Sequence, residues 1–138
     1  MAITSAICNS YKQEVLEGVH SSADTYKIAL FTDAASLGAS TTAYSSTNEV
    51  ANGNGYTTGG ETLSGFSSGL SGSTAYLTFT DVSWADATIT ARGCLIYNSS
   101  KSNKAVATFD FGQNVSSSSG TFTVDFPVAG SSALIRIA

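Results

Sequence analysis

Two carboxylates beside a tryptophan have the residue types and spacing that come closest to a catalytic site. Asp81 and Asp86 flank Trp84, and an aromatic ring beside acidic residues is typical of enzymes that cleave sugars. Such a glycosidase would pair Asp81 or Asp86 with another carboxylate, for example Glu49. The segment also lies between two predicted strands, where Asp and Ser form turns by bonding to their own backbone and a Trp side chain caps the core. We therefore interpret residues 81–86 as a turn, with a binding surface at Trp84 as the alternative.

His20 is the one histidine of the chain, so no zinc site of the His/Cys type can form around it. A Ser-His-Asp triad would have to use His20, but among 23 serines a partner is always available, so the coincidence carries no information. No serine lies in the Gly-x-Ser-x-Gly motif of hydrolases. We expect His20 to interact with carbonyl groups at the end of a helix or with water, and we expect no catalytic residue and no metal site.

Cys8 and Cys94 are the two cysteines, too few for the disulfide framework of a small secreted domain. We expect two buried thiols. A bridge that forms after release from a reducing cytoplasm is the alternative.

The glycine-rich segment at residues 53–60 is superficially similar to a dinucleotide-binding loop. Thr58 stands where that motif needs its third glycine, and no helical pattern follows. We interpret the segment as a loop in which the backbone needs positive φ, and we expect no cofactor.

Hydroxyl groups replace charges over much of this chain. Ser and Thr together account for 40 of 138 residues, whereas Lys and Arg number six and are scattered. Nucleic-acid binding needs clustered cations, and a membrane span needs about 18 consecutive apolar residues, so we expect neither. Residues 1–5 lack the basic start and long apolar run of a secretory signal, which predicts a protein made in the cytoplasm.

The spacing of apolar residues predicts one domain over residues 1–138, with one helix and many strands. An N-terminal arm at residues 1–22 contains a helix over residues 9–18, with Asn9 as its cap and Gly18 as its end. Residues 26–32 are apolar on both faces, which predicts a central strand. Residues 33–74 form a long Ser/Thr/Gly-rich excursion, in which we expect short strands near residues 49–50 and 62–63.

Two-residue alternation predicts further strands over residues 75–82, 87–97, 105–111, 122–126 and 133–137, with a hairpin turn at residues 98–103. Short strands without helices between them cannot form a parallel sheet. The fold class predicted is therefore all-β, an antiparallel β-sandwich of the jelly-roll type with one short N-terminal helix. Its core is expected to contain Trp84, Phe109, Phe111, Phe122, Val124 and Phe126.

Several of these segments together resemble a family of small structural proteins of tailed bacteriophages. The resemblance spans almost the whole chain, in order, through residues 8–18, 24–31, 41–44, 48–50, 53–60, 84, 87–93, 104–107 and 110–112. Members of that family whose role can be placed are similar to capsid cement, or head decoration, proteins.

The resemblance implies a jelly-roll protein without catalytic residues or cofactors. Such a protein is made in the bacterial cytoplasm and binds the outer surface of the virion head, where it stabilises the capsid by bridging neighbouring major capsid subunits. It also implies self-association, for which we expect a homodimer before a homotrimer. We expect contacts with the capsid or between copies in the N-terminal arm and in the excursion. The candidate residues are Ile3, Ile7, Tyr11, Tyr44, Tyr56 and Phe66.

One further binding function is compatible with this sequence. Jelly rolls often bind sugars, and Trp84 with the loop tyrosines could stack on pyranose rings, so a host-adhesion or carbohydrate-binding module of the virion is the alternative.

Overall fold

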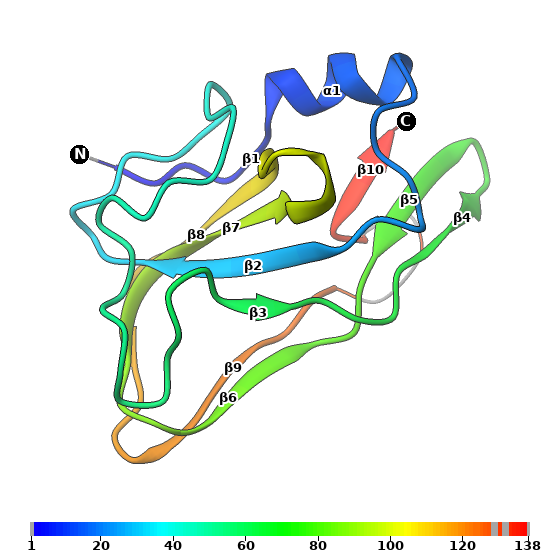
Figure 1. The fold of residues 1–138 in the computed structure, drawn as a ribbon. Helices are drawn as coiled ribbons and strands as arrows, with labels where there is room; N and C mark the ends of the chain where they lie inside the picture. The colour runs from blue at the N-terminus through cyan, green and yellow to red at the C-terminus, as the bar shows by residue number, and fades with distance from the viewer. Residues whose placement is uncertain (1, 128–129, 131–132, 138) are drawn as a thin grey trace.

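The computed structural model describes residues 2–127, 130 and 133–137 (Figure 1). In chain order its elements are β1 (Ala6–Ile7), α1 (Asn9–Leu16), β2 (Tyr26–Phe31), β3 (Glu61–Thr62), β4 (Ser67–Ser71), β5 (Thr74–Thr78), β6 (Val82–Ala87), β7 (Thr90–Asn98), the short 3-10 helix η1 (Ser99–Lys101), β8 (Lys104–Ser116), β9 (Gly120–Val124) and β10 (Ile135–Ile137).

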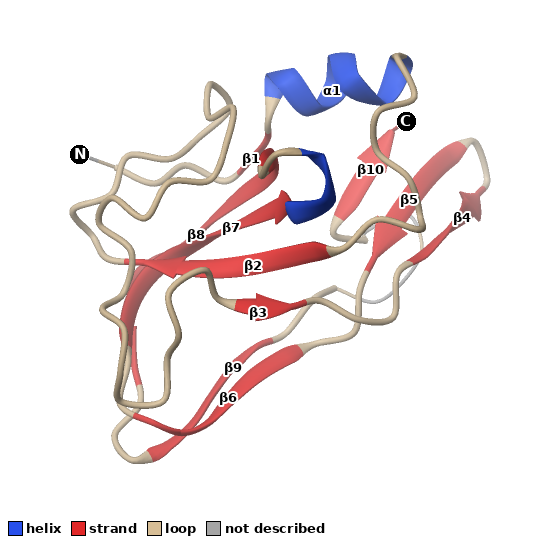
Figure 2. Cartoon of the chain, in the orientation of Figure 1, coloured by secondary structure: helices blue, strands red, loops and turns tan. Residues whose placement is uncertain are grey.

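All pairs of these strands are antiparallel, and they form three sheets. The largest has the order β1-β8-β7-β2-β3, and the others are β10-β5-β4 and the pair β6-β9. Figure 2 shows the five-stranded sheet on one side and the two smaller sheets following each other along its other side. The all-β, antiparallel prediction with one short helix is confirmed.

β2 is the central strand that the apolar pattern predicted. It lies between β7 and β3, and Ile28, Ala29 and Leu30 are fully buried. A strand covered on both faces must be apolar at consecutive positions, because side chains alternate between the faces.

The predicted hairpin between β7 and β8 is also confirmed. The Asn98 side chain accepts a hydrogen bond from the Ser100 backbone N–H at 3.0 Å, and Ser102 adopts the left-handed conformation with φ of 56°. The pairing shifts register between Ala91 and Gly93, which bends the hairpin. At Gly93 a Cβ atom would lie 2.4 Å from the Phe109 carbonyl oxygen, so only glycine allows this approach.

The predicted turn at residues 81–86 is wrong, because those residues form most of β6. The predicted strands over 75–82 and 87–97 correspondingly have other bounds, β5 ending at Thr78 and β7 beginning at Thr90. β6 pairs with β9 through a bulge that places Asp86 at a φ of 49°. Ladder bonds to β9 therefore override the turn preference of Asp and Ser. The prediction that Trp84 caps the core is confirmed, since it is 2% exposed.

The helix α1 ends at Leu16, two residues before the predicted end, and Gly18 follows with a φ of 74°. The predicted cap at Asn9 is wrong. Cys8 holds the N-cap position without a side-chain bond to the helix, and its extended backbone N–H donates to the Val106 carbonyl at 3.0 Å. Pairing to β8 thus sets where the helix begins.

The excursion at residues 33–74 contains β3, β4 and a bridge between Phe31 and Glu49, close to the short strands predicted at residues 49–50 and 62–63.

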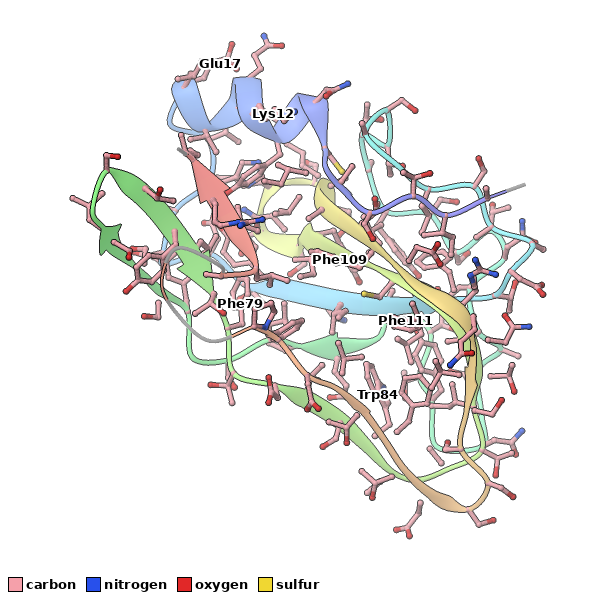
Figure 3. The ribbon with its side chains drawn as sticks, turned by 180° about the vertical axis from the view of Figure 1, so that it is seen from behind. Lys12, Glu17, Phe79, Trp84, Phe109 and Phe111 are labelled. Atoms are coloured by element: carbon pink, nitrogen blue, oxygen red, sulfur yellow. The ribbon has the colours of Figure 1, made fainter. Side chains whose placement is uncertain are left out.

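Trp84 lies between the layers (Figure 3). Its ring centroid is 6.0 Å from that of Tyr56 and 6.1 Å from that of Phe122. Of the predicted core, Trp84, Phe122 and Val124 are buried, while Phe109, Phe111 and Phe126 are only partly buried. Cys8 and Cys94 are buried free thiols, and burial raises the pKa of Cys8 to about 11 and of Cys94 to about 12.

Replacing Trp84 by Ala removes the largest side chain between the layers. We expect W84A to lower the free energy of unfolding by about 3 to 5 kcal/mol, measured by chemical denaturation. Leu70→Ala is the control, because Leu70 is 73% exposed and its truncation leaves no cavity. Equal stability of W84A and the parent would contradict the burial of Trp84.

Candidate interaction surface

A groove runs along one side of the domain, between the β1–β8 edge of the large sheet and the outer strands β9 and β10 of the two smaller sheets. Three hollows lie along it, of about 200, 290 and 320 Å³. Neighbouring hollows share lining residues. Phe111 and Val124 line both the 200 Å³ and the 290 Å³ hollow, and Arg136 lines both the 290 Å³ and the 320 Å³ hollow. We call this surface the lateral groove.

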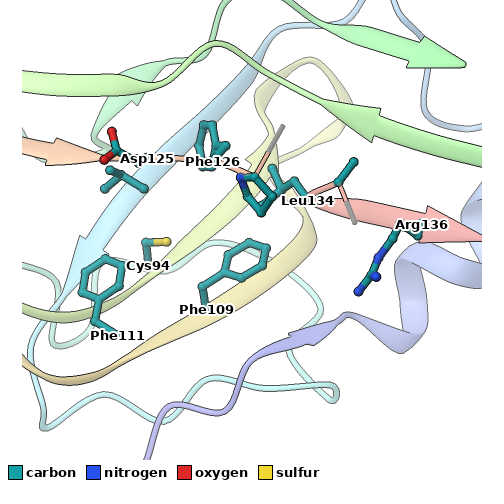
Figure 4. A pocket seen from close by; sticks show the side chains of 10 residues that line it. Cys94, Phe109, Phe111, Asp125, Phe126, Leu134 and Arg136 are labelled. Carbon is teal, nitrogen blue, oxygen red and sulfur yellow. The ribbon is translucent and has the colours of Figure 1, made fainter. Parts of the chain in front are cut away.

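The middle hollow accounts for the incomplete burial of three predicted core residues. Phe109 and Phe111 lie on the same face of β8, two residues apart, and point across the hollow toward Phe126 and Leu134 (Figure 4). Cys94 lies at its base and Arg136 at one end. Phe109, Phe111 and Phe126 line this hollow and are therefore only partly buried.

The hollow at the helix end lies between α1 and β10. Its walls are almost entirely apolar, from Ile7, Val15 and Leu16 on one side to Ile135 and Ile137 on the other. Leu16 is 88% exposed and Ile137 is 58% exposed. Single exposed apolar residues are ordinary, but two that flank an apolar hollow form a surface suited to a partner.

The hollow at the opposite end lies between β8 and β9, and Phe111, Val115, Phe122 and Val124 line it. Val115 is another large hydrophobic residue with notable exposure. Charged residues line the hollows as well: Asp125 lines this one and the middle one, Arg136 lines the middle one and the one at the helix end, and Lys12 lines the one at the helix end.

Strand pairing explains why this side of the domain is open. β1 covers β8 only at Thr108 and Ala107, and the Ser5 hydroxyl accepts a bond from the Asp110 N–H at 2.8 Å. Beyond Asp110, no described strand pairs with the outer edge of β8. Likewise β9 pairs only with β6, and β10 only with β5, among the described strands. Both walls of the groove therefore end in strands that have a described strand partner on one side only.

Two of the predicted contact residues lie in this groove. Ile7 is partly buried, and Tyr11 is 7% exposed with its ring against the hollow. Ile3 is buried at a bridge with Leu37, away from the groove. Phe66 is partly buried, and its ring centroid lies 5.6 Å from that of Phe79.

Tyr44 and Tyr56, the other predicted contacts, hold the excursion to the sheet. Their hydroxyl groups donate to the two oxygens of Glu49, each at 2.5 Å, and the Gly59 N–H donates to the same carboxylate at 2.7 Å. Tyr44 also stacks on Tyr97, with ring centroids 4.5 Å apart. Burial, and then the hydrogen bond to Glu49, raise the pKa of both tyrosines well above its usual range. In this conformation the two rings serve packing inside the domain.

The carboxylates considered for glycoside cleavage have structural partners. Glu49 is bound by the tyrosines above, and Asp81 accepts a bond from the Phe126 N–H at 2.7 Å. Asp81 directly precedes β6, Asp86 lies within β6 and Glu49 lies in the excursion, and none of these three acids lines any of the hollows described above. Within the described residues no group of three or more His, Cys, Asp or Glu side chains could hold a metal ion, and no described helix is long and apolar enough to span a membrane.

His20 belongs to a buried polar network that fixes α1, and the prediction that it meets helix carbonyls or water is wrong. Its side chain is 3% exposed, and its Nε2 lies 2.9 Å from Glu14 on the helix. Its Nδ1 lies 3.0 Å from the Asn98 amide nitrogen, which also donates to Asp24 at 2.8 Å. Because the Asn98 oxygen accepts from Ser100, the amide orientation is set.

This orientation also sets the histidine tautomer. With both amide hydrogens of Asn98 used as donors, Nδ1 of His20 must accept, so Nε2 carries the proton and donates it to Glu14. Two lysines complete the network, Lys101 at 2.7 Å from Asp24 and Lys104 at 3.5 Å from Glu14. The network joins the helical wall of the lateral groove to the β7–β8 hairpin.

The exposed members of the groove, Leu16 and Ile137, were missed by the sequence reasoning. Both belong to apolar patterns that predict core positions, and no local signal distinguishes a residue that faces a neighbour from one that faces an open side.

Comparisons with family models, with curated proteins and with solved structures find no match to this chain. Function is therefore inferred from the groove and its surroundings.

Asp24 should make stability depend on pH in the acid range. Hydrogen bonds from Lys101 and Asn98 lower the pKa of Asp24 to about 2, from 3.8. A depressed pKa stabilises the fold above the unfolded value and loses that stabilisation as pH falls toward the folded value. We expect D24N to unfold at lower denaturant concentration than the parent at pH 6, and the difference to shrink between pH 4 and pH 2.

Asp125→Asn is the matched control for this experiment, because Asp125 is an exposed carboxylate on a different part of the surface. A parent-to-D24N difference that stays constant from pH 6 to pH 2 would contradict the role of the Asp24 carboxylate.

Proposed function

We propose that this chain is a virion structural protein of a tailed bacteriophage, which binds the outside of the head as a cement protein and bridges neighbouring major capsid subunits. It acts by binding and not by catalysis. The observation that carries the proposal is the lateral groove, a row of three largely apolar hollows between Val115 and Leu16. The family resemblance of residues 8–18 and the segments that follow supplies the identity of the partner.

We also propose that the all-β fold is a sandwich of the jelly-roll type. Two observations support this: every pair of strands is antiparallel, and the strands β5, β6, β9 and β10 form a second layer against the five-stranded sheet (Figure 1).

Exposed apolar area gives the groove its binding energy. Each Å² of apolar surface removed from water contributes roughly 25 cal/mol, and a partner that fills the three hollows removes the exposed parts of Leu16, Ile137 and Val115. The chain as a whole is rich in Ser and Thr, whose hydroxyl groups form hydrogen bonds without the desolvation cost of ions. Such a surface suits a protein partner.

Binding across two capsid subunits would stabilise the assembled shell. A protein that binds only where neighbouring subunits are in place lowers the free energy of that state and not of the separated subunits. Self-association, for which a homodimer is proposed before a homotrimer, would add avidity, so that each contact can be weak alone. Localisation on the outer surface of the head follows from the same proposal.

The carbohydrate-binding alternative has less support from the side chains. It depended on Trp84 and the loop tyrosines as stacking platforms. Trp84 and Tyr56 are buried, and one face of Tyr44 is occupied by Tyr97. A protein partner at the lateral groove is therefore the function we develop.

Binding to heads that lack this protein tests the proposal. We expect the purified protein to cosediment with such heads, and Leu16→Asp or Ile137→Asp to weaken that binding at least ~10-fold, because each places a charge in the apolar contact. Leu70→Asp is the matched control, since Leu70 is exposed on β4 outside the groove, and it should bind as the parent does. Equal binding by all three variants would contradict the groove as the contact, and absence of binding by the parent would contradict the function.

The oligomeric state is a separate test. Light scattering at micromolar concentration should give twice the chain mass of 14.1 kDa. A monomer under those conditions would contradict self-association. It would not bear on the contact with the capsid, which cosedimentation with heads tests.

A further inference from the structure

A separate hollow, of about 390 Å³, lies between the end of β2 and the first part of the excursion. Phe31 and residues within 35–48 line it, and none of them lines the lateral groove. Its volume falls in the range of small-molecule sites, about 300–1,000 Å³. We call it the hydroxyl hollow, because six of the eleven described residues that line it are Ser or Thr.

The hydroxyl hollow has an apolar base and an uncharged rim. Phe31 and Ala35 are each 1% exposed and Leu37 is partly buried, so these side chains form the base. The rim consists of exposed hydroxyl and amide side chains, and no Asp, Glu, Lys or Arg is among the described residues that line the hollow. A ligand charge that entered it would lose water without gaining a partner. The lining therefore favours a neutral ligand that has both apolar and hydroxyl groups.

Three rim hydroxyl groups are available to such a ligand. Those of Ser36, Ser40 and Thr42 form no hydrogen bond with any other described residue. By contrast, the Thr41 hydroxyl accepts from a backbone N–H of the excursion at 3.0 Å. A hydroxyl group both donates and accepts, so the three can bond to ligand hydroxyl groups without breaking a bond of the fold.

Backbone hydrogen bonds hold the walls of the hydroxyl hollow on three sides. The Asn48 carbonyl accepts from the first residue after β2 at 3.0 Å, and the Leu37 carbonyl accepts from the N-terminal arm at 2.8 Å. The Thr42 carbonyl accepts from β8 at 3.0 Å. The hollow is therefore formed before a ligand arrives, and binding does not have to order the excursion.

We propose that the hydroxyl hollow binds a neutral sugar ring, because such a ring has an apolar C–H face and several hydroxyl groups at its edge. The C–H face lies on Ala35 and Leu37, and the sugar hydroxyl groups bond to those of Ser36, Ser40 and Thr42. This site differs from the Trp84 surface considered in the sequence. It gives the chain a second binding activity, on other residues than the proposed contact with the capsid.

NMR titration of the whole protein tests the site, with the methyl glycosides of glucose, galactose, mannose and N-acetylglucosamine as ligands. At millimolar concentration at least one of them should shift the backbone amide signals of residues 35–48 and leave the other signals unchanged. A disaccharide of the sugar that binds distinguishes two sources of the ring. Tighter binding of the disaccharide indicates a glycan chain, and equal binding indicates a single sugar, and both agree with the proposal.

Removing single rim hydroxyl groups tests the assigned contacts. Ser36→Ala and Thr42→Ala should each weaken sugar binding roughly 3- to 10-fold, because each removes one hydrogen bond to the ligand and none within the fold. Thr58→Ala is the matched control, since Thr58 is exposed and lines none of the hollows described, and it should bind as the parent does. Unchanged affinity of both rim variants would overturn these contacts.

Two further ligands test the chemistry of the lining. Glycerol has hydroxyl groups without a ring face, and the uronic acid of the sugar that binds has the same ring with a carboxylate. Both should bind at least ~10-fold more weakly than the neutral glycoside. Equal binding of either, or no shift at residues 35–48 with any glycoside, would overturn the proposal. None of these results bears on binding to heads, because the lateral groove has other lining residues.

Discussion

The pairing of β7 with β8 is the interaction on which the rest of this structure depends. It runs from Thr90 opposite Ser116 to Asn98 opposite Lys104, the longest ladder among the described strands. β2 adds to the free edge of β7 and β1 to the free edge of β8, so the large sheet grows outward from this hairpin. The close approach at Gly93 and the amide of Asn98 fix its bend and its end. Both α1 and the excursion are attached to it, through His20 and Tyr97.

The length of β8 also creates the open side of the molecule. Its first half is covered by β1, but its second half continues past the end of that short strand, with Phe109 and Phe111 on the inner face. Between the layers, the rings of Tyr56, Trp84 and Phe122 pack against one another. Aromatic packing thus fills the space around Trp84, whereas the side along the outer half of β8 stays open among the described residues. A protein that stabilises an assembly needs such an incomplete surface, because the missing contacts are formed only in the complex.

Local patterns predicted the parts of this fold that depend on neighbours in sequence. The apolar run of β2 and the polar turn after Asn98 correctly indicated a central strand and a hairpin, since both follow from side-chain alternation and turn chemistry. The same reasoning failed for residues 81–86, where Asp and Ser favour a turn but pairing to β9 holds an extended strand. It also misplaced the cap of α1, because the backbone of Cys8 is bound by β8. In both cases a partner distant in sequence outweighed the local preference.

The sequence by itself determined that the chain is rich in strands, short of charge and without the clustered cations or metal-ligand patterns of several large functional classes. It also determined which residues are apolar enough to be core. Only the tertiary structure decided that Trp84 is covered on both sides while Phe109 and Phe111 face an opening, and that Leu16 and Ile137 meet across a hollow. The reason is physical: a side chain's type fixes its preference for leaving water, but the packing of distant strands decides whether the chain itself or a partner satisfies that preference.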